Sequence, residues 1–292
     1  MRLLLGLVEV LPLAWGRGLG VGLARLARRL RPADVAVARA NLARAFPDTS
    51  AAARERLLAA AVDHLGINLF HTLAAPRLVS RPDVIATAPA SASGDADTAT
   101  VLAGLAAEGR GVFILTGHIG CWELAGAWVA RELASRGLGP LGVVTGTVHN
   151  PPVDDLLQGR RRDLGMQPLP RDGGVRPLLA LLRRGGVVAV LLDQRTGVRN
   201  LPVPFFGVPA PTPLGPARIA LRHGIPVLPV VGVWDAASRR HVMHHLPPLR
   251  PDAAGGETAA GFLARCNGAL ETFVRRNPAQ WVWFHRRWSP DT

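Results

Sequence analysis

A histidine and a glutamate with four residues between them offer acid–base chemistry in the segment TGHIGCWE at 116–123. The preceding run GVFILT at 111–116 predicts a buried strand, and the residues from 121 onward predict a helix. His118 then lies in a strand-to-helix turn, and Glu123 lies about one turn into the helix, from where its carboxylate can fold back toward the imidazole. A carboxylate in that position would select the tautomer of His118 and stabilise its imidazolium while His118 accepts a proton from a substrate hydroxyl.

The glycines beside this histidine leave room for the close approach of a substrate, because Gly117 and Gly120 carry no Cβ. Backbone N–H groups at the helix start, near Cys121 and Trp122, are candidate donors to a developing oxyanion. A structural alternative remains: an ordinary loop histidine, followed by a glutamate that complements the helix dipole.

The elements that must position this pair alternate from residue 98 onward, which predicts an α/β fold with a central, mostly parallel or mixed sheet flanked by helices. We predict strands at 111–116, 141–146, 187–192, 225–233 and 240–246. Helices are predicted at 33–46, 51–77, 98–108, 121–136, 152–164, 174–184, 213–223 and 257–276. We expect a linker at 88–96 and a long Pro/Gly-rich loop at 193–214, of the kind that carries function.

Residues 3–30 are strongly apolar, but Glu9, Pro12 and Arg17 interrupt them and an arginine cluster ends them. A charge near the centre of a membrane span costs roughly 2.5–3.5 kcal/mol, so we expect neither a spanning helix nor a cleaved signal peptide. The pattern favours a helix lying in the membrane interface, with the arginines near an anionic cytoplasmic leaflet. A buried core helix is the alternative. The chain therefore divides into a membrane-association segment, 1–31, and one domain, 32–292.

The composition excludes several classes of protein. Apolar residues make up 48% of the 292 and charged residues 19%, which rules out a disordered chain. The formal charge of +13 comes from arginine alone as the basic residue and favours acidic partners. Two cysteines cannot form a disulfide framework, and no Cys/His metal spacing or G-x-S-x-G nucleophile elbow occurs. We expect no metal and no cofactor.

Four blocks, in this order, resemble the late acyltransferases of lipid A biosynthesis, the lauroyl/myristoyl acyltransferase family, which is similar to lysophospholipid acyltransferases. The blocks are NL with AFP at 41–47, GHIGCWE at 117–123, DQ with VPFFGVPA at 193–210, and NPAQWVWFHRRW at 277–288. The resemblance spans about residues 38–288. Cys121 stands where the family usually has asparagine, so we expect no amide contact there.

This resemblance implies transfer of a fatty acyl group from acyl carrier protein, or from coenzyme A, to a hydroxyl of a lipid A precursor, with His118 and Glu123 as the catalytic pair. Two alternatives remain: a phosphatidylinositol mannoside or other lysophospholipid or glycolipid as acceptor, and a non-catalytic basic protein that binds membrane surfaces. The implied partners are acyl carrier protein, an anionic membrane surface and a glycolipid acceptor. We expect no nucleic acid, and a peripheral or monotopic location on the cytoplasmic face of the inner membrane.

Substrate-binding residues are expected in the arginine-rich stretch 160–199 and in the following loop. Arg162 and Arg171 resemble substrate-binding positions of the family, and Asp193 ends a predicted strand at the carboxyl edge of the sheet, where ligands bind, although it could instead cap the loop. Phe205 and Phe206 would either wall an acyl channel or fill the core under the loop. The full expected set is Arg162, Arg171, Asp193, Gln194, Arg195, Phe205 and Phe206.

Overall fold

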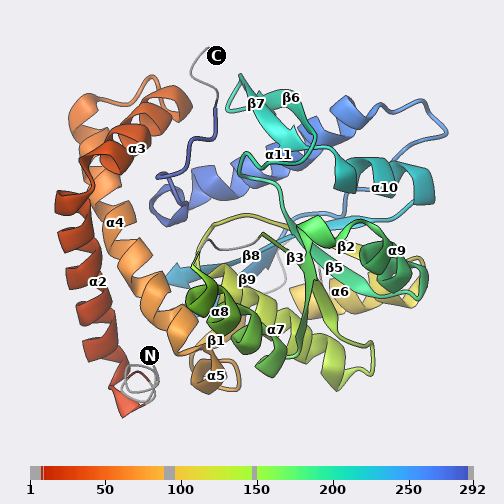
Figure 1. Ribbon diagram of the computed structural model, residues 1–292, viewed down its shortest axis with the longest axis horizontal. Helices are drawn as coiled ribbons and strands as arrows, with labels where there is room; N and C mark the ends of the chain where they lie inside the picture. Colours follow the sequence, from red (N-terminus) through yellow and green to blue (C-terminus); the bar gives the residue numbers. More distant parts are fainter. Residues whose placement is uncertain (1–7, 9, 89–95, 147–149, 289–292) are drawn as a thin grey trace.

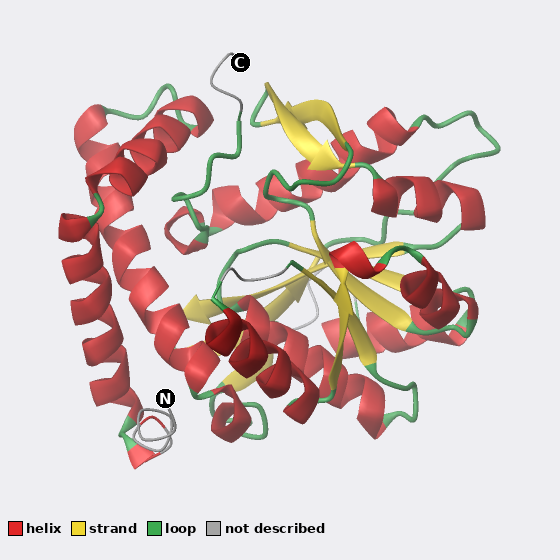
Figure 2. Cartoon of the chain, viewed as in Figure 1, coloured by secondary structure: helices red, strands yellow, loops and turns green. Residues whose placement is uncertain are grey.

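The computed structural model describes residues 8, 10–88, 96–146 and 150–288, and its centre is a seven-stranded sheet between layers of helices (Figures 1 and 2). The strand order is β1-β9-β8-β2-β5-β3-β4. The bounds are β1 (Ile85–Thr87), β2 (Val112–Thr116), β3 (Leu141–Thr145), β4 (Met166–Pro170), β5 (Val187–Leu191), β8 (Val227–Asp235) and β9 (Arg240–His245). The strands from β8 to β4 are parallel, while β9 is antiparallel to β8. This confirms the predicted mostly parallel α/β fold.

Helices cover both faces of the sheet because its central strands are apolar on both sides. In β2, Val112 and Ile114 pack on the side of α6 (Thr98–Ala107) and α7 (Trp122–Ser135). Phe113 and Leu115 pack on the opposite side. That second layer contains α9 (Arg176–Arg183), α10 (Gly215–His223) and α11 (Ala259–Arg276), whereas α8 (Pro151–Asp163), with no buried residue, connects β3 to β4. β2 therefore lies in the centre of the core and presents its carboxyl end at one edge.

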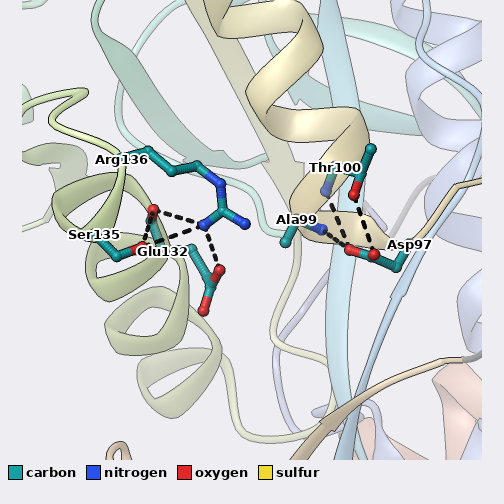
Figure 3. A network of polar contacts seen from close by, with 6 residues as sticks. All are labelled: Asp97, Ala99, Thr100, Glu132, Ser135 and Arg136. Atoms are coloured by element: carbon teal, nitrogen blue, oxygen red, sulfur yellow. Dashed lines mark hydrogen bonds and ion pairs between the residues drawn. The ribbon is translucent and has the colours of Figure 1, made fainter.

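Two sets of polar contacts lie at the start of α6 and at the end of α7 (Figure 3). Asp97 caps α6 by accepting hydrogen bonds from the backbone N–H groups of Ala99 and Thr100, at 2.8 and 3.1 Å. Arg136, which follows α7, pairs with Glu132 at 2.5 Å. The hydrogen bonds at the cap are the main cause that lowers the pKa of the Asp97 carboxyl, and the charge of the Arg136 guanidinium lowers it further.

The N-terminal helices form a layer beside the sheet edge, with α2 (Leu13–Leu30) antiparallel to α4 (Ala51–Leu73) (Figure 1). The two helices touch through glycines: a Cβ on Gly20 would lie 2.2 Å from the carbonyl oxygen of Gly66. Two shorter helices, α3 (Pro32–Ala45) and α5 (Ala75–Leu78), complete the layer. Among the described residues, no helix combines the length and the hydropathy that crossing a membrane requires. Residues 3–7 and 9 of the predicted N-terminal helix lie outside the described part of the chain.

The predicted strands and helices appear within a few residues of their predicted bounds, but four strands were missed. The strands β1 and β4 were not expected, and most of the predicted linker 88–96 lies outside the described residues. The predicted loop 193–214 contains an antiparallel hairpin, β6 (Asn200–Phe205) and β7 (Val208–Pro213). Its prolines occupy alternate pairs, Pro202 opposite Pro211 and Pro204 opposite Pro209, so their missing N–H groups fall at positions that need no ladder bond. The loop prediction is therefore wrong for residues 200–213.

Candidate active site

His118 lies at the carboxyl end of β2, and its carboxylate partner comes from the neighbouring strand β5. The imidazole Nδ1 of His118 is 3.0 Å from Oδ1 of Asp193, and the backbone N–H of His118 donates to Oδ2 of the same carboxylate at 2.7 Å. β2 and β5 are paired in parallel up to Thr116 and Leu191, so the residues two positions beyond each strand end meet at the same edge. His118 keeps 24% of its side chain exposed, whereas Asp193 keeps 1%.

Asp193 is a buried carboxylate that accepts three hydrogen bonds. Besides the two from His118, the indole Nε1 of Trp281 donates to Oδ2 at 2.8 Å. Burial by itself raises the pKa of this carboxyl, but the charge and hydrogen bonds of His118 and the bond from Trp281 outweigh burial and lower the pKa below its usual range. Asp193 is therefore ionised, and His118 and Trp281 already occupy its carboxylate oxygens. This corrects its expected role as a residue that contacts substrate.

The two glycines around His118 are required by close packing. A Cβ on Gly117 would lie 2.9 Å from Cγ of Asp193. Gly120 has φ of +60°, and a Cβ there would lie 2.1 Å from the carbonyl oxygen of Gly232 on β8. Both glycines thus serve the tight seating of the turn against β5 and β8, and the room that they leave is filled by the protein itself.

Glu123 has a different partner from the one predicted. Its carboxylate binds the guanidinium of Arg161 on α8 in a bidentate pair, with Arg161 Nε at 3.0 Å from Oε2 and Arg161 Nη2 on Oε1. Arg161 Nη1 also lies 3.3 Å from Oε1 of Gln158. The side chains of Arg161 and Glu123 are 16% and 12% exposed, so the ion pair is largely screened from water. The expected contact between Glu123 and the imidazole is corrected to one between Asp193 and the imidazole.

The start of α7 offers fewer free donors than expected. The backbone N–H of Cys121 donates to the carbonyl oxygen of Gly232 at 3.0 Å and is not available to an oxyanion. The thiol of Cys121 is buried, with Sγ 3.8 Å from the hydroxyl of Thr72, and burial raises its pKa to about 12. Cys121 is thus a packing residue without nucleophilic character.

A cavity of about 770 Å³ lies beside the pair of His118 and Asp193. His118, Trp122 and Glu123 line it, and its inner wall is apolar, formed on one face of the sheet by Ile114, Ala125, Gly126, Val129, Leu141 and Ala189. Further apolar lining comes from the opposite face, from Val144, Leu169, Leu178, Val190, Leu192 and Ile219. The cavity therefore reaches both faces of the sheet.

The passage between the faces has a cause in the strand register. β3 is paired with β5 only from Leu141 opposite Val187 to Val143 opposite Ala189. β3 stays paired with β4 up to Thr145, and β5 stays paired with β2 up to Leu191. The carboxyl ends of β3 and β5 therefore separate. Side chains of both strand ends line the cavity in the resulting gap.

The predicted substrate-binding residues fall into two groups. Arg171, Gln194 and Arg195 line the cavity, as does Arg199, which we had not selected. Arg162 lines a neighbouring depression that shares Thr145, Gly146 and Pro170 with the cavity. These cations give the apolar cavity a positive rim.

Phe205 and Phe206 are in the core and not in the lining of the cavity. They are 0% and 7% exposed, and their rings lie 5.0 Å apart between centroids. Phe205 also packs on Trp281 and Trp288, and Phe206 on Phe46. The structure corrects their assignment as a channel wall in favour of the alternative, core packing under the hairpin.

Sequence reasoning missed the contacts of two residues of the site. Arg161 belongs to a run of three arginines. Without the position of Glu123, the helical periodicity does not indicate which of Arg161 and Arg162 faces the site. Trp281 carried a weak signal, as the first of three tryptophans in the last block. Its contact with Asp193 depends on chain segments 88 residues apart.

The fold and the site define an α/β protein with an acid–histidine pair at the open edge of its sheet, above an apolar cavity with a cationic rim. The sequence matches the family described as bacterial lipid A biosynthesis acyltransferase over residues 2–289, and the chain belongs to this family. The predicted resemblance is confirmed.

Individual relatives have different acceptors in their names. The lipid A biosynthesis lauroyltransferase of Escherichia coli K12 is 25% identical over 291 residues, which cover 97% of this chain and 88% of that protein. The palmitoleoyltransferase of the same strain is 26% identical over 271 residues, 92% of this chain and 83% of that protein. The phosphatidylinositol mannoside acyltransferase of Mycobacterium tuberculosis H37Rv is 29% identical over 195 residues, 63% of this chain. This last match spans 57% of the length of the mycobacterial protein.

Proposed function

We propose that this protein transfers a fatty acyl group from the thioester of acyl carrier protein, or of coenzyme A, to a hydroxyl of a lipid A precursor. The observation that carries the proposal is the position of His118, which Asp193 holds in the lining of a largely apolar cavity of about 770 Å³. The cavity suits a fatty acyl chain, and the arginines at its rim suit the phosphates of either donor and of the acceptor.

In the proposed mechanism, His118 is the general base. Its Nδ1–H donates to Asp193, which leaves the lone pair on Nε2 to accept the proton of the acceptor hydroxyl as the oxygen attacks the thioester carbonyl. The tetrahedral intermediate then expels the thiolate, which takes the proton back from His118. The products are an ester and a free thiol.

Glu123 is proposed as a positioning residue for Arg161. A guanidinium has five N–H donors, and the carboxylate of Glu123 and the amide of Gln158 use three of them. The remaining donors of Arg161, which lines the cavity, can bind an oxygen of the substrate, including the oxyanion that forms on the thioester carbonyl.

We further propose a peripheral location on the cytoplasmic face of the inner membrane. Its support is the outer face of α2, where Trp15, Leu19, Leu23, Leu26 and Leu30 are all at least half exposed and follow one another at three- or four-residue spacing. The net charge of +13 favours an anionic leaflet, and it also favours the acidic acyl carrier protein as donor.

The test is acyl transfer by the membrane-bound protein from labelled acyl carrier protein to a tetra-acylated, Kdo-bearing lipid A precursor, with H118A as the variant. Product from the wild type and none from H118A supports both reaction and base. Transfer to a phosphatidylinositol mannoside instead would keep the mechanism and change the acceptor, an alternative that the mycobacterial relatives favour. Lipid binding without turnover in either protein would support the non-catalytic alternative.

A further inference from the structure

A second depression, of about 590 Å³, lies among the N-terminal helices and shares no lining residue with the cavity at His118. It is lined by Arg25, Arg28 and Arg29 from the end of α2, by Arg39 from α3, and by Asp63 from α4. Four guanidinium groups from two helices converge on one hollow, which no step of the proposed reaction uses.

The acidic groups around the depression neutralise only part of this charge. Asp63 accepts two hydrogen bonds from Arg25, both of 2.7 Å. Glu55 pairs with Arg39 at 2.5 Å and with Arg28 at 3.4 Å. Two carboxylates against four guanidiniums leave a local excess of two positive charges. Among the interactions found in the described part of the chain, none involves the guanidinium of Arg29.

The depression adjoins the exposed apolar stripe of α2. On a helix of 100° per residue, Arg29 lies about 60° from Leu26 and Arg25 about 100° from it, so both arginines flank the exposed leucines. If the leucines enter the acyl region of a bilayer, this geometry puts the arginines at the depth of the phosphates. Free phosphate would gain nothing from the leucines, so the stripe favours a lipid as the ligand.

We propose that this depression binds the phosphate headgroup of an anionic membrane lipid, with Arg29 as the principal donor and with Arg25 and Arg28 beside it. The pairs with Asp63 and Glu55 hold Arg25, Arg28 and Arg39 in place before the lipid arrives. A planar guanidinium suits a phosphate through two parallel N–H donors, which an ammonium lacks. The site thus recognises a headgroup, in addition to the general attraction between a basic protein and an anionic surface.

The test measures binding of the full chain to vesicles of phosphatidylcholine alone and with phosphatidylglycerol, for the wild type, R29Q, R29K and R31Q. Arg31 is the matched control: it is exposed, lies two residues further along, and is outside the depression. We expect R29Q to weaken binding to the phosphatidylglycerol vesicles at least fivefold more than R31Q does. We expect R29K to fall clearly below the wild type although its charge is the same.

Equal losses in R29Q and R31Q would show that diffuse charge alone acts, and R29K binding like the wild type would show that the guanidinium fork is not used; either result overturns the proposal. Binding of inorganic phosphate that depends on Arg29 and matches the vesicle affinity would make a free anion the ligand and would also overturn it. Thermal unfolding of each variant checks the fold. Acyl transfer in detergent micelles is measured separately, so failure of this site is distinguishable from failure of the proposed reaction.

Discussion

A histidine acts as a general base only while its proton and its lone pair sit on the correct nitrogens. Asp193 fixes both for His118, because a buried ionised carboxylate beside Nδ1 requires a proton there. The same carboxylate also accepts the backbone N–H of His118 and the indole N–H of Trp281, so it is itself held in place. One buried group therefore orients the ring, the turn and the last sequence block together.

We expect D193N to lower kcat by about 10²–10⁴-fold while KM changes little. An asparagine oxygen can still accept the N–H groups of His118 and Trp281, but its amide nitrogen would then face Nδ1 of His118 and favour the tautomer that carries its proton on Nε2. Steady-state kinetics of acyl transfer measure this effect.

The matched control for this prediction is D48N, an exposed aspartate before α4, which should behave like the wild type. The double variant H118A/D193N should be no slower than H118A, because both residues act as one unit. A multiplicative loss in the double variant would assign Asp193 a role independent of His118.

The sequence singled out His118 as the candidate base but not Asp193 as its partner, for a reason of geometry. The position of Glu123, five residues after His118, follows from the geometry of a helix. Asp193, in contrast, reaches His118 only through the pairing of β2 with β5. The edge at which Asp193 would lie was predictable, since strands end there. Which strands are neighbours was not, because the chain visits β3 and β4 before it inserts β5 between β2 and β3.

At the scale of elements, the gap between β3 and β5 connects the cavity linings on the two faces of the sheet. The helix α7 covers one side of this gap, and its face toward the sheet is formed by Ala125, Gly126 and Val129. The small residues Ala125 and Gly126 are thus followed by Val129, one helical turn further along α7 from His118. This order places Val129 where the far part of a bound chain would lie.

We expect V129F to shift the preference of the enzyme toward shorter acyl donors. Val129 is 2% exposed and lines the cavity, so a larger side chain there must occupy cavity volume. Discrimination in an apolar pocket amounts to about 1–3 kcal/mol per methylene, which makes the shift measurable. The assay compares kcat/KM for donors of increasing chain length.

V101F on α6 is a suitable control, because Val101 is half-buried and does not line the cavity. It should leave the order of donor preference unchanged. If V129F lowered kcat/KM equally for every chain length, the acyl chain would have to bind elsewhere.

The hairpin β6–β7 shows where element prediction failed. Five prolines between residues 202 and 213 argue against a central strand, and they were interpreted as a loop. Within the described part of the chain, the hairpin pairs with no further strand. Its prolines alternate, and a tight turn at Phe206 and Gly207, with φ of +53° and +73°, closes it. In the sequence, only the alternation of proline with Leu201, Val203 and Phe205 indicates a strand.

At the scale of the whole molecule, the side chain of Asn41 links the first and last sequence blocks. The amide nitrogen of Asn41 on α3 donates to the carbonyl oxygens of Trp283 and His285, both at 2.7 Å. The sequence separations are 242 and 244 residues, and Asn41 is 3% exposed. The helical N-terminal layer is thereby attached to the segment that carries Trp281 and hence to Asp193.

We expect N41A to lower the free energy of unfolding by about 1–3 kcal/mol for each buried carbonyl that loses its donor. Acyl transfer at low temperature should persist, because Asn41 does not contact the cavity. Urea denaturation measures the loss. N150A, which removes an exposed asparagine at the start of α8, is the control and should cost less. A stability of N41A equal to that of the wild type would contradict the proposed attachment.

Three of the described histidines are buried: His64 and His71 on α4, and His241 on β9, which contacts His71. His71 Nδ1 and His241 Nε2 are 2.8 Å apart, and His64 Nε2 is buried without a hydrogen-bond partner among the described residues. Burial lowers the pKa of His64 to about 4 and, with the charges of Arg17, His64 and Arg77, that of His71 to about 3. The pKa of His241 is also lowered, chiefly by burial and then by His71, His64 and Arg17. All three rings are therefore neutral in the folded protein near neutral pH.

We expect the folded state to lose stability as the pH falls below about 6.5, the pKa of histidine in the unfolded chain. Between about pH 6.5 and the lowered folded-state values, the unfolded chain binds protons that the folded chain does not, so the free energy of unfolding falls with the pH. Each buried histidine contributes a slope of up to about 1.4 kcal/mol per pH unit. H64L should reduce the slope by about one proton without a large loss at neutral pH, because Nε2 of His64 has no partner to lose. Urea denaturation at several pH values measures the slope, with exposed H223Q as the control. A slope that is unchanged in H64L would mean that acid acts elsewhere, because a ring that is neutral in the fold must take up its proton on unfolding.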